Sequence, residues 1–400
     1  MLSKRIRMAS LIPALAAASA LSLTGCGDEA TGPGDNPPPP GPPTYENIAT
    51  FVGTGLNGLS PDGLAPTQTE LSLPQDITWG PDGQPYILDW NNHRVRTITG
   101  GVIQTVVGTG ELGDAPDGPA DLCKLNHPTH VSFDPQGRLI LSAWHNSKLM
   151  RMDMGTGMIA TFCGNGNRTF SGDGGPAIDA EVDLPIATAW GPGGEMYFTD
   201  EASVRIRMID ATGIVTTFCG DGTRGYSGDG GLAANAQIHL PGGQAAIPVG
   251  RICVKGGTLY YADTNNHIIR AIDLSTTIIT TVAGTPEQFG YSGDGGPATS
   301  ALLAGPADMD LDDAGNMYIA DTFNNVVRKV DTSGIITTFA GGGPPLTQEE
   351  LDAINPGDPL PVRDGPVESS LLDRPYGVAV DADQKVYIAD THHNRIRVVY

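Results

Sequence analysis

The sequence predicts an all-β fold: a six-bladed β-propeller of four-stranded blades, closed by an N-terminal strand that completes the last blade. Two observations predict it. A pattern that is clearest from Tyr318 to Gly341 occurs six times along the chain. The last copy, which ends at Tyr400, lacks a fourth strand, whereas NIATFVGTG near Asn47 matches the fourth-strand pattern IITTFAGGG and has no blade of its own. Circular closure would bury the edges that an open row of blades exposes.

The amino terminus has the pattern of a signal peptide. Three cations precede an uncharged apolar run from about Ala9 to Leu23, which is shorter than the roughly 20 residues of a membrane-spanning helix. The run ends in Leu23-Thr24-Gly25-Cys26, which resembles the bacterial lipobox. That resemblance implies cleavage after residue 25 and acylation of Cys26, so that the protein is exported and anchored to a membrane by lipid. The alternative is an ordinary secretory signal with an unrelated cysteine.

The chain then divides into a tether and a folded body. Residues 26–45 are rich in Pro and Gly and too poor in apolar residues to fold, so they are expected to form an extended tether. Residues 46–400 are assigned to the propeller. Because Gly27 rather than Asp follows Cys26, resemblance to the enterobacterial sorting rule favours the outer membrane of the cell envelope.

Composition agrees with a turn-rich β protein and excludes one class of partner. The formal net charge is -22, and it becomes more negative once the signal peptide, with three cations and no acids, is removed. A chain this acidic is not expected to bind nucleic acid. Only 17% of residues are charged while glycine contributes 54, as in a protein built of many short strands and turns.

An aspartate and an arginine seven residues apart mark five of the six copies. The second copy has Ala143 and Met150 at these positions, so both residues are lost together. Joint loss predicts that the two form one structural unit, in which a turn-binding carboxylate pairs with a strand cation. The pairs are Asp89 and Arg96, Asp200 and Arg207, Asp263 and Arg270, Asp321 and Arg328, and Asp390 and Arg397.

A second marker, Asp-Gly, precedes each copy and is followed by a short run of small residues. This pattern predicts a turn that leads into a short helix, with the carboxylate accepting free backbone N–H groups. Calcium binding is the alternative. The markers begin at Asp62, Asp117, Asp173, Asp229, Asp294 and Asp364.

These motifs resemble the NHL-repeat family, named for a pattern of Asn, His and Leu and including teneurin-type repeats. The similar segments are SGDGGPA, YIADTFNNVVRKVD and GIITTFAG, and the resemblance covers about residues 45–400. It implies a six-bladed propeller. Departures occur in the second copy, at Ala143 and Met150, and in the fourth, where PVGRICVKGG replaces the usual acidic turn.

The start of each first strand should face the central axis. Two residues after the proline that opens these strands stand Asp76, His130 and Asp308, and Asp310 and Tyr376 lie nearby. We expect them at the mouth of the channel, where they could bind a ligand. His130, Asp76 and Asp308 are also a reasonable ligand set for a divalent cation. Resemblance to six-bladed amidating lyases of NHL type favours metal slightly, although those enzymes use a His from three blades.

The other histidines are expected to be exposed turn residues. They are His93, His145, His239, His267, His392 and His393.

The body cysteines Cys123, Cys163, Cys219 and Cys253 are either buried thiols or disulfide partners, with Cys123 and Cys163 the first pair to test. The longest insertion, 341–363, contains TQEELDAI, a capping-box pattern that predicts a short helix. Loops of this kind on a rigid scaffold often bind partners.

Three functions remain open at this point, one of which is a role as an assembly part within a larger envelope complex. The absence of a recognisable catalytic motif favours a non-enzymatic envelope lipoprotein that binds an envelope or extracellular protein or a glycan. The alternative is a metal-dependent propeller hydrolase or lyase with its site at the channel mouth.

Overall fold

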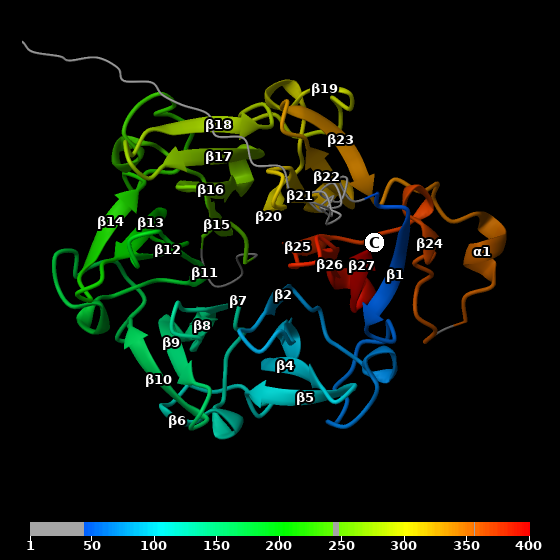
Figure 1. The fold of residues 1–400 in the computed structure, drawn as a ribbon, viewed down its shortest axis with the longest axis horizontal. Coiled ribbons are helices and arrows are strands. Elements are labelled where there is room, and N and C mark those ends of the chain that lie inside the picture. Colours follow the sequence, from blue (N-terminus) through cyan, green and yellow to red (C-terminus); the bar gives the residue numbers. More distant parts are fainter. Residues whose placement is uncertain (1–43, 243–247, 356) are drawn as a thin grey trace, which may run out of the picture. The chain divides into compact units, whose positions relative to one another are not determined.

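The computed structural model describes residues 44–242, 248–355 and 357–400. Within these ranges six antiparallel sheets are arranged as blades around a common axis (Figure 1). The innermost strands contact one another in the order β2, β7, β11, β15, β20, β25, and β25 contacts β2. This ring confirms the predicted six-bladed propeller. The predicted signal peptide, Cys26 and nearly all of the tether lie outside the described residues.

Each blade has four main strands, numbered from the axis outward. Blade one contains β2 (Asp76–Trp79), β3 (Pro85–Asp89), β4 (Arg94–Thr99) and β5 (Val102–Val107). Blade two contains β7 (His130–Phe133), β8 (Leu139–Ala143), β9 (Lys148–Asp153) and β10 (Met158–Cys163), with the short edge strand β6 (Gly118–Pro119). Blade three contains β11 (Pro185–Trp190), β12 (Met196–Asp200), β13 (Arg205–Ile209) and β14 (Val215–Cys219).

The next three blades repeat the arrangement. They are β15 (Ile252–Lys255), β16 (Thr258–Asp263), β17 (Ile268–Asp273) and β18 (Ile279–Ala283); β20 (Pro306–Leu311), β21 (Met317–Asp321), β22 (Val326–Val330) and β23 (Ile335–Ala340), with β19 (Gly296–Pro297); and β25 (Pro375–Val380), β26 (Val386–Asp390), β27 (Arg395–Val399) and β1 (Asn47–Val52), with β24 (Gly365–Pro366).

The ring closes through β1. This strand pairs antiparallel with β27, with Ile48 opposite Val399 and Thr50 opposite Arg397, and takes the outer position that β5 holds in blade one. The backbone edge of β27 is therefore paired, as the sequence predicted.

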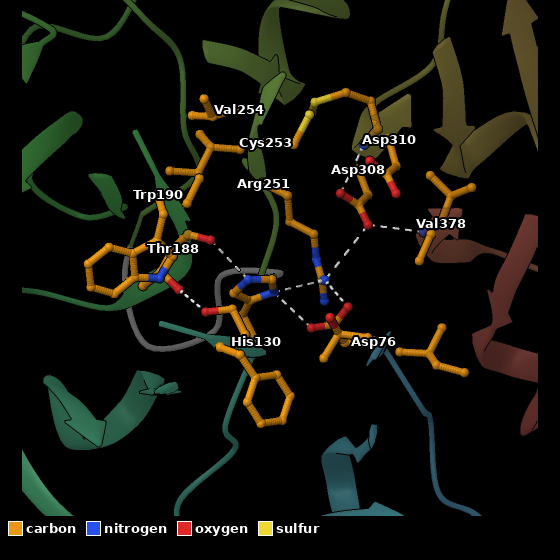
Figure 2. Close-up of a pocket in the computed structure, with 18 of the residues that line it drawn as sticks. Asp76, His130, Thr188, Trp190, Arg251, Cys253, Val254, Asp308, Asp310 and Val378 are labelled. Atoms are coloured by element: carbon orange, nitrogen blue, oxygen red, sulfur yellow. Dashed lines mark hydrogen bonds and ion pairs between the residues drawn. The ribbon is translucent and has the colours of Figure 1, made fainter. Parts of the chain in front are cut away.

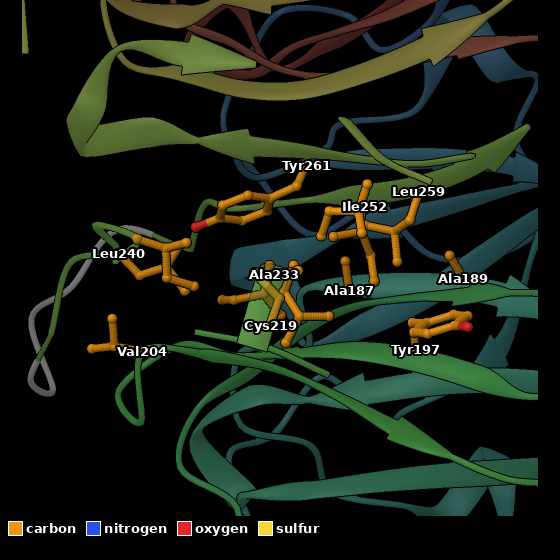
Figure 3. Close-up of a cluster of buried hydrophobic side chains, with 14 of the residues drawn as sticks. Ala187, Ala189, Tyr197, Val204, Cys219, Ala233, Leu240, Ile252, Leu259 and Tyr261 are labelled. Atoms are coloured by element: carbon orange, nitrogen blue, oxygen red, sulfur yellow. The ribbon is translucent and has the colours of Figure 1, made fainter. Parts of the chain in front are cut away.

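Neighbouring blades pack through apolar side chains of their facing surfaces. Between blades three and four, Tyr197 and Cys219 belong to the same buried cluster as Ile252, Leu259 and Tyr261 (Figure 3). Alternation along each strand sends these side chains to the faces that meet. Each blade thus shares one apolar core with the blade on either side. The cores are complete only when the blades form the ring.

A turn of 3₁₀ helix follows each Asp-Gly marker, so the short helix is present. The carboxylate's role differs from the expectation: in blade five, Asp294 accepts the backbone N–H of Thr338 at 3.1 Å and its hydroxyl at 2.8 Å instead of capping the helix. Strand register shifts next to this threonine, which leaves its N–H free for the carboxylate. The six helices are Pro66–Gln68, Ala120–Leu122, Ala177–Asp179, Ala233–Asn235, Ala298–Ser300 and Val367–Ser369.

A second set of 3₁₀ helices follows the second strand in five blades. They are Trp90–Asn92, Trp144–Asn146, Thr264–Asn266, Thr322–Asn324 and Thr391–His393.

The repeated arginine is fully buried and pairs with two aspartates. In blade five, Arg328 lies 3.5 Å from the buried Asp321 and 2.5 Å from Asp294 of the Asp-Gly marker. Asp321 also accepts the backbone N–H of Ala304 at 2.6 Å. One guanidinium thereby joins the marker turn, the second strand and the third strand. Blades one, three, four and six contain the same arrangement.

Blade two replaces this network with apolar contacts. Ala143 and Met150 are completely buried in one cluster with Ile159. The backbone N–H that the missing aspartate would bind, that of Asn126, donates instead to the side chain of Asn146 at 3.0 Å. Replacing a buried ion pair with well-packed apolar residues is often neutral for stability.

The cysteines decide between the two alternatives stated for them, and two histidines depart from expectation. Cys123, Cys163, Cys219 and Cys253 are free thiols, so the Cys123–Cys163 disulfide is wrong. Cys123 and Cys163 belong to different buried clusters. His93 and His393 are buried rather than exposed; His393 Nδ1 lies 2.9 Å from Asp390 Oδ2, within its turn.

The insertion contains the predicted helix. Helix α1 (Gln348–Asp352) begins after Thr347, and Thr347 and Glu350 form the reciprocal capping box. The Glu350 carboxylate also accepts from Arg363, and both of its oxygens lie 3.0 Å from the same guanidinium nitrogen. Across the described ranges, no helix has the length and apolar character needed to cross a membrane.

Blade two suggests a test of the buried network. We expect Arg328→Met alone to lower the free energy of unfolding by about 3–5 kcal/mol, because it leaves Asp321 buried without its cation. Arg328→Met combined with Asp321→Ala should cost less than Arg328→Met alone, since Asn324 can take the Ala304 N–H as Asn146 does in blade two. Urea unfolding at pH 7 measures both.

Lys255→Met is the control, because the ion pair of Lys255 with Asp313 is exposed and should contribute less than about 1 kcal/mol. A double variant at least as unstable as the sum of its single variants would contradict this account of the network.

Candidate functional site

Four charged side chains from different blades meet at the axis. Asp76 lies opposite Leu88, His130 opposite Ser142, and Asp308 opposite Ala320. Each of these partners directly precedes the residue at the aspartate position of the repeat, which is Asp89, Ala143 or Asp321. In blade four the equivalent position belongs to Arg251, whose carbonyl accepts the N–H of Ala262 at 3.0 Å.

The guanidinium of Arg251 is the centre of this group (Figure 2). Its Nη1 lies 2.6 Å from Asp76 Oδ1 and 3.7 Å from Asp308 Oδ2. Its Nη2 donates to the carbonyls of Gln75 and Thr129, both at 2.9 Å. Arg251 thus ties blade four to blades one, two and five while its side chain is 3% exposed.

The two aspartates also hold neighbouring backbone groups. Asp76 Oδ2 accepts from the N–H of Val131 at 3.0 Å and lies 2.8 Å from His130 Nδ1. His130 Nε2 lies 3.1 Å from the carbonyl of Thr188, so both ring nitrogens face acceptors. Asp308 Oδ2 accepts from Val378 N–H at 3.0 Å. Six blades are therefore joined at the axis by one polar cluster.

The electrostatics of the two carboxyls differ. Burial opposes the charge of Asp76, but Arg251 and His130 outweigh it and hold the pKa of Asp76 well below its usual range. Burial raises the pKa of Asp308 to about 7, because its more distant contact with Arg251 compensates less. Burial likewise raises the pKa of Asp310 to about 6. Asp308 and Asp310 therefore change charge near neutral pH.

A cavity of about 330 Å³ lies along the axis beside this cluster. Asp76, His130, Arg251, Asp308 and Asp310 contribute its charged side. The walls further along the strands include Trp79, Phe133 and Trp190, which are partly exposed, and the paired hydroxyls of Ser132 and Thr188. The cavity therefore combines a polar end with aromatic walls.

The predicted metal set is corrected by Arg251. His130, Asp76 and Asp308 do come together, but they surround a guanidinium that takes the place of a cation. In the described part of the chain, no group of three or more His, Cys, Asp or Glu side chains is arranged to hold a metal ion. The fixed positive charge also opposes binding of a second cation.

The other two predicted residues, Asp310 and Tyr376, differ in whether they line the cavity. Asp310 lines the cavity and accepts the N–H groups of Val380 and Leu311, both at 2.8 Å. Tyr376 does not line it: the ring is buried in a small cluster with Val249 and Ala307, and burial raises the pKa of its hydroxyl. The expectation of a ring beside the open channel is wrong for Tyr376.

The sequence did not predict Arg251 at the axis, because the position two residues after the opening proline, Pro248, is Gly250 in this blade. Strand pairing shows that blade four is offset by one residue, and such an offset exchanges the side chain that faces the axis. The signal was the segment PVGRICVKGG, in which a cation stands three residues after the proline, where the other blades have an uncharged residue: Ile77, Val131, Thr188, Met309 or Val378.

Comparison with known proteins identifies the repeat. The family model described as NHL repeat matches residues 372–399, in blade six. Over 378 residues the chain is 25% identical to teneurin-3 of Danio rerio, covering 88% of this chain and 13% of that protein. It is 27% identical over 259 residues to the chloroplastic protein SUPPRESSOR OF QUENCHING 1 of Arabidopsis thaliana, covering 62% and 24%. The chain therefore spans less than a quarter of the length of these relatives.

Solved structures share the fold at low sequence identity. A structural genomics protein of unknown function from Bacteroides thetaiotaomicron has a TM-score of 0.62 at 20% identity, covering 88% of this chain and 75% of that one. An auxiliary nutrient binding protein from Bacteroides ovatus has a TM-score of 0.62 at 16% identity, covering 89% and 77%. These likenesses concern the propeller architecture alone.

The raised pKa of Asp308 predicts a pH effect on stability. Between about pH 4 and 7 the folded chain keeps a proton on Asp308 that the unfolded chain has lost, so its contribution to stability falls as pH rises. At about 1.4 kcal/mol for each unit of pKa, we expect Asp308 to account for a loss on the order of 2–3 kcal/mol between pH 5 and 8.

Asp308→Asn should reduce this loss, as measured by urea unfolding at the two pH values. Asp313→Asn is the control, because the Asp313 side chain is 76% exposed. Equal pH dependence in Asp308→Asn and the parent chain would contradict the assignment.

Proposed function

We propose that this chain, an NHL-repeat β-propeller, is a non-enzymatic binding protein of the cell envelope that holds a small neutral sugar in its axial cavity. The observation that carries the proposal is the state of the axial charges. Asp76 and Arg251 neutralise each other, and the other carboxylates accept backbone N–H groups. These contacts join neighbouring blades, which favours binding over metal-dependent hydrolase or lyase chemistry.

The remaining surface of the cavity suits a sugar. The rings of Trp79, Phe133 and Trp190 can pack against the C–H faces of a pyranose, while the carboxylates and the Ser132 and Thr188 hydroxyls can bind its hydroxyl groups. The volume of about 330 Å³ is at the lower end of the roughly 300–1,000 Å³ of small-molecule sites. A neutral ligand is favoured because it adds no charge to a cluster that is already paired.

The names of similar folds support a binding role. Two neighbours, from Bacteroides ovatus and Bacteroides thetaiotaomicron, are called auxiliary nutrient binding proteins, with TM-scores of 0.62 for both. A sugar is one class of nutrient that a protein at the envelope meets.

The location at the envelope is part of the proposal. The signal peptide pattern and the lipobox-like Leu23-Thr24-Gly25-Cys26 support export and lipid attachment at Cys26, with the Pro-rich tether between the membrane and the propeller. Gly27 supports the outer membrane as destination.

A cavity-filling variant tests the sugar site. Ala379 lines the cavity, so Ala379→Phe should fill it and weaken the binding of any sugar found in a calorimetric panel of neutral mono- and disaccharides by at least about tenfold. Ala382→Phe, three residues away in an exposed turn, should leave affinity unchanged. Either no binding across the panel or equal affinity in the two variants would refute the axial sugar site.

Replacement of the proposed lipidated residue tests the anchor. Cys26→Ser removes the thiol that would be acylated, so the chain should lose labelling by a radioactive fatty acid and leave the membrane fraction. Cys253→Ser changes a body cysteine and should preserve both labelling and membrane association. Retained labelling in Cys26→Ser would contradict lipid attachment at this residue.

A further inference from the structure

A second cavity, which shares Trp190 with the lining of the axial one, lies in the groove between blades two and three. Its volume is about 510 Å³. Blade two contributes Arg151 and Phe162, and blade three contributes Trp190 and Gly194. The groove is therefore walled by two aromatic rings and a cation.

Arg151 is a cation without an acidic partner within the described ranges. Its guanidinium lies 5.1 Å above the Phe162 ring centre. The neighbouring Arg138, also in the groove wall, is already paired with Asp134 at 2.6 Å. Burial and the repulsion from Arg138 lower the pKa of Arg151. An anion in the groove would offset both effects, because it favours the charged form of Arg151.

One carboxylate, that of Asp210, also lines the groove. It is held by its own turn, where it accepts from the N–H and hydroxyl of Thr212 at 2.8 and 2.7 Å and from the N–H of Ile214 at 3.0 Å. Its charge is thus spread over three donors, while the Arg151 guanidinium is left for a ligand.

The propeller itself shows what fits such a groove. Between blades five and six, the equivalent space is taken by the ring of Tyr45, which lies 5.1 Å from the Phe339 ring and 5.6 Å from Lys329 Nζ. The Tyr45 hydroxyl donates to the Gln384 carbonyl at 2.7 Å.

The repeat relates the two grooves residue by residue. Phe162 and Phe339 precede the last residue of the fourth strand, and Arg151 and Lys329 follow the repeat position held by Met150 and Arg328. Gly194 and Gln384 occupy the same turn, since each donates its N–H to the residue three before it. The groove of blades two and three therefore shares the phenylalanine, cation and turn positions of the Tyr45 site, with Ile140 in place of Tyr318, and no tyrosine from the described chain is among its lining residues.

We propose that this groove binds a planar aromatic ring that carries a carboxylate, such as a hydroxybenzoate. The ring takes the place that Tyr45 has in the other groove, against Phe162 and Trp190, and the carboxylate pairs with Arg151. A hydroxyl on the far side of the ring can reach the turn at Gly194, as the Tyr45 hydroxyl reaches Gln384. This site goes beyond the proposed sugar site and does not depend on it.

Calorimetry of the full-length chain with three probes tests the proposal. We expect 4-hydroxybenzoate to bind with a stoichiometry of one, about tenfold or more tightly than 4-hydroxybenzyl alcohol, which lacks the charge, or cyclohexanecarboxylate, which lacks the aromatic ring. Equal affinity for the three probes, or no binding at millimolar concentration, would overturn it.

Two matched variants locate the site. Arg151→Gln should weaken 4-hydroxybenzoate about tenfold or more, while Lys329→Gln, at the equivalent position of the occupied groove, should leave its affinity unchanged; both should unfold at the same urea concentration as the parent chain. Unchanged affinity in Arg151→Gln would place the ligand elsewhere and refute the proposal. Ala379→Phe, which fills the axial cavity, should leave the affinity for 4-hydroxybenzoate unchanged. Failure of the proposed sugar site can therefore be distinguished from failure of this one.

Removing the Tyr45 ring from the groove between blades five and six tests whether the two grooves are equivalent. Tyr45→Ala removes the ring beside Lys329 and should create a second site, so that the stoichiometry for 4-hydroxybenzoate rises from one to two. A stoichiometry that stays at one would contradict the structural equivalence on which the proposal rests.

Discussion

Five of the six blades contain an arginine that is completely shielded from water and held between two aspartates. Desolvation of a guanidinium is costly, and it is tolerated because the marker aspartate and nearby carbonyls accept its hydrogen bonds while the buried strand aspartate lies within ion-pair distance. The second aspartate of each network also fixes the marker turn to the fourth strand through a threonine, as Asp294 does with Thr338. In these five blades one cation thus joins the second and third strands to the marker turn.

The same chemistry recurs once at the axis, with a different geometry. Arg251 lies between Asp76 and Asp308, but these residues belong to three separate blades, so the interaction joins blades instead of strands. The axial cavity therefore has a polar end, in which Asp76 and Arg251 form a close ion pair, beside aromatic walls. Such a surface is suited to selecting a ligand by shape and hydrogen bonding.

Internal repetition allows one blade to explain another. Blade two shows that the buried ion network can be replaced by Ala143 and Met150 when Asn146 takes over the backbone contact. The groove filled by Tyr45 shows what the unfilled groove beside Arg151 can accommodate. In both comparisons the side chains at matching repeat positions can be read against each other.

The sequence by itself determined the number of blades, the closure through Asn47–Val52, the Asp and Arg pairs and the capped helix at Thr347, because each rests on local patterns that recur at matching positions. It also brought Asp76, His130, Asp308 and Asp310 to the axis correctly. Only the tertiary structure decided what these residues do there. Arg251 faces the axis through a one-residue offset in blade four, and Tyr376 turns into an apolar cluster. Strand register and contacts between distant blades settle such positions, and neither is written in the spacing of residues along one copy.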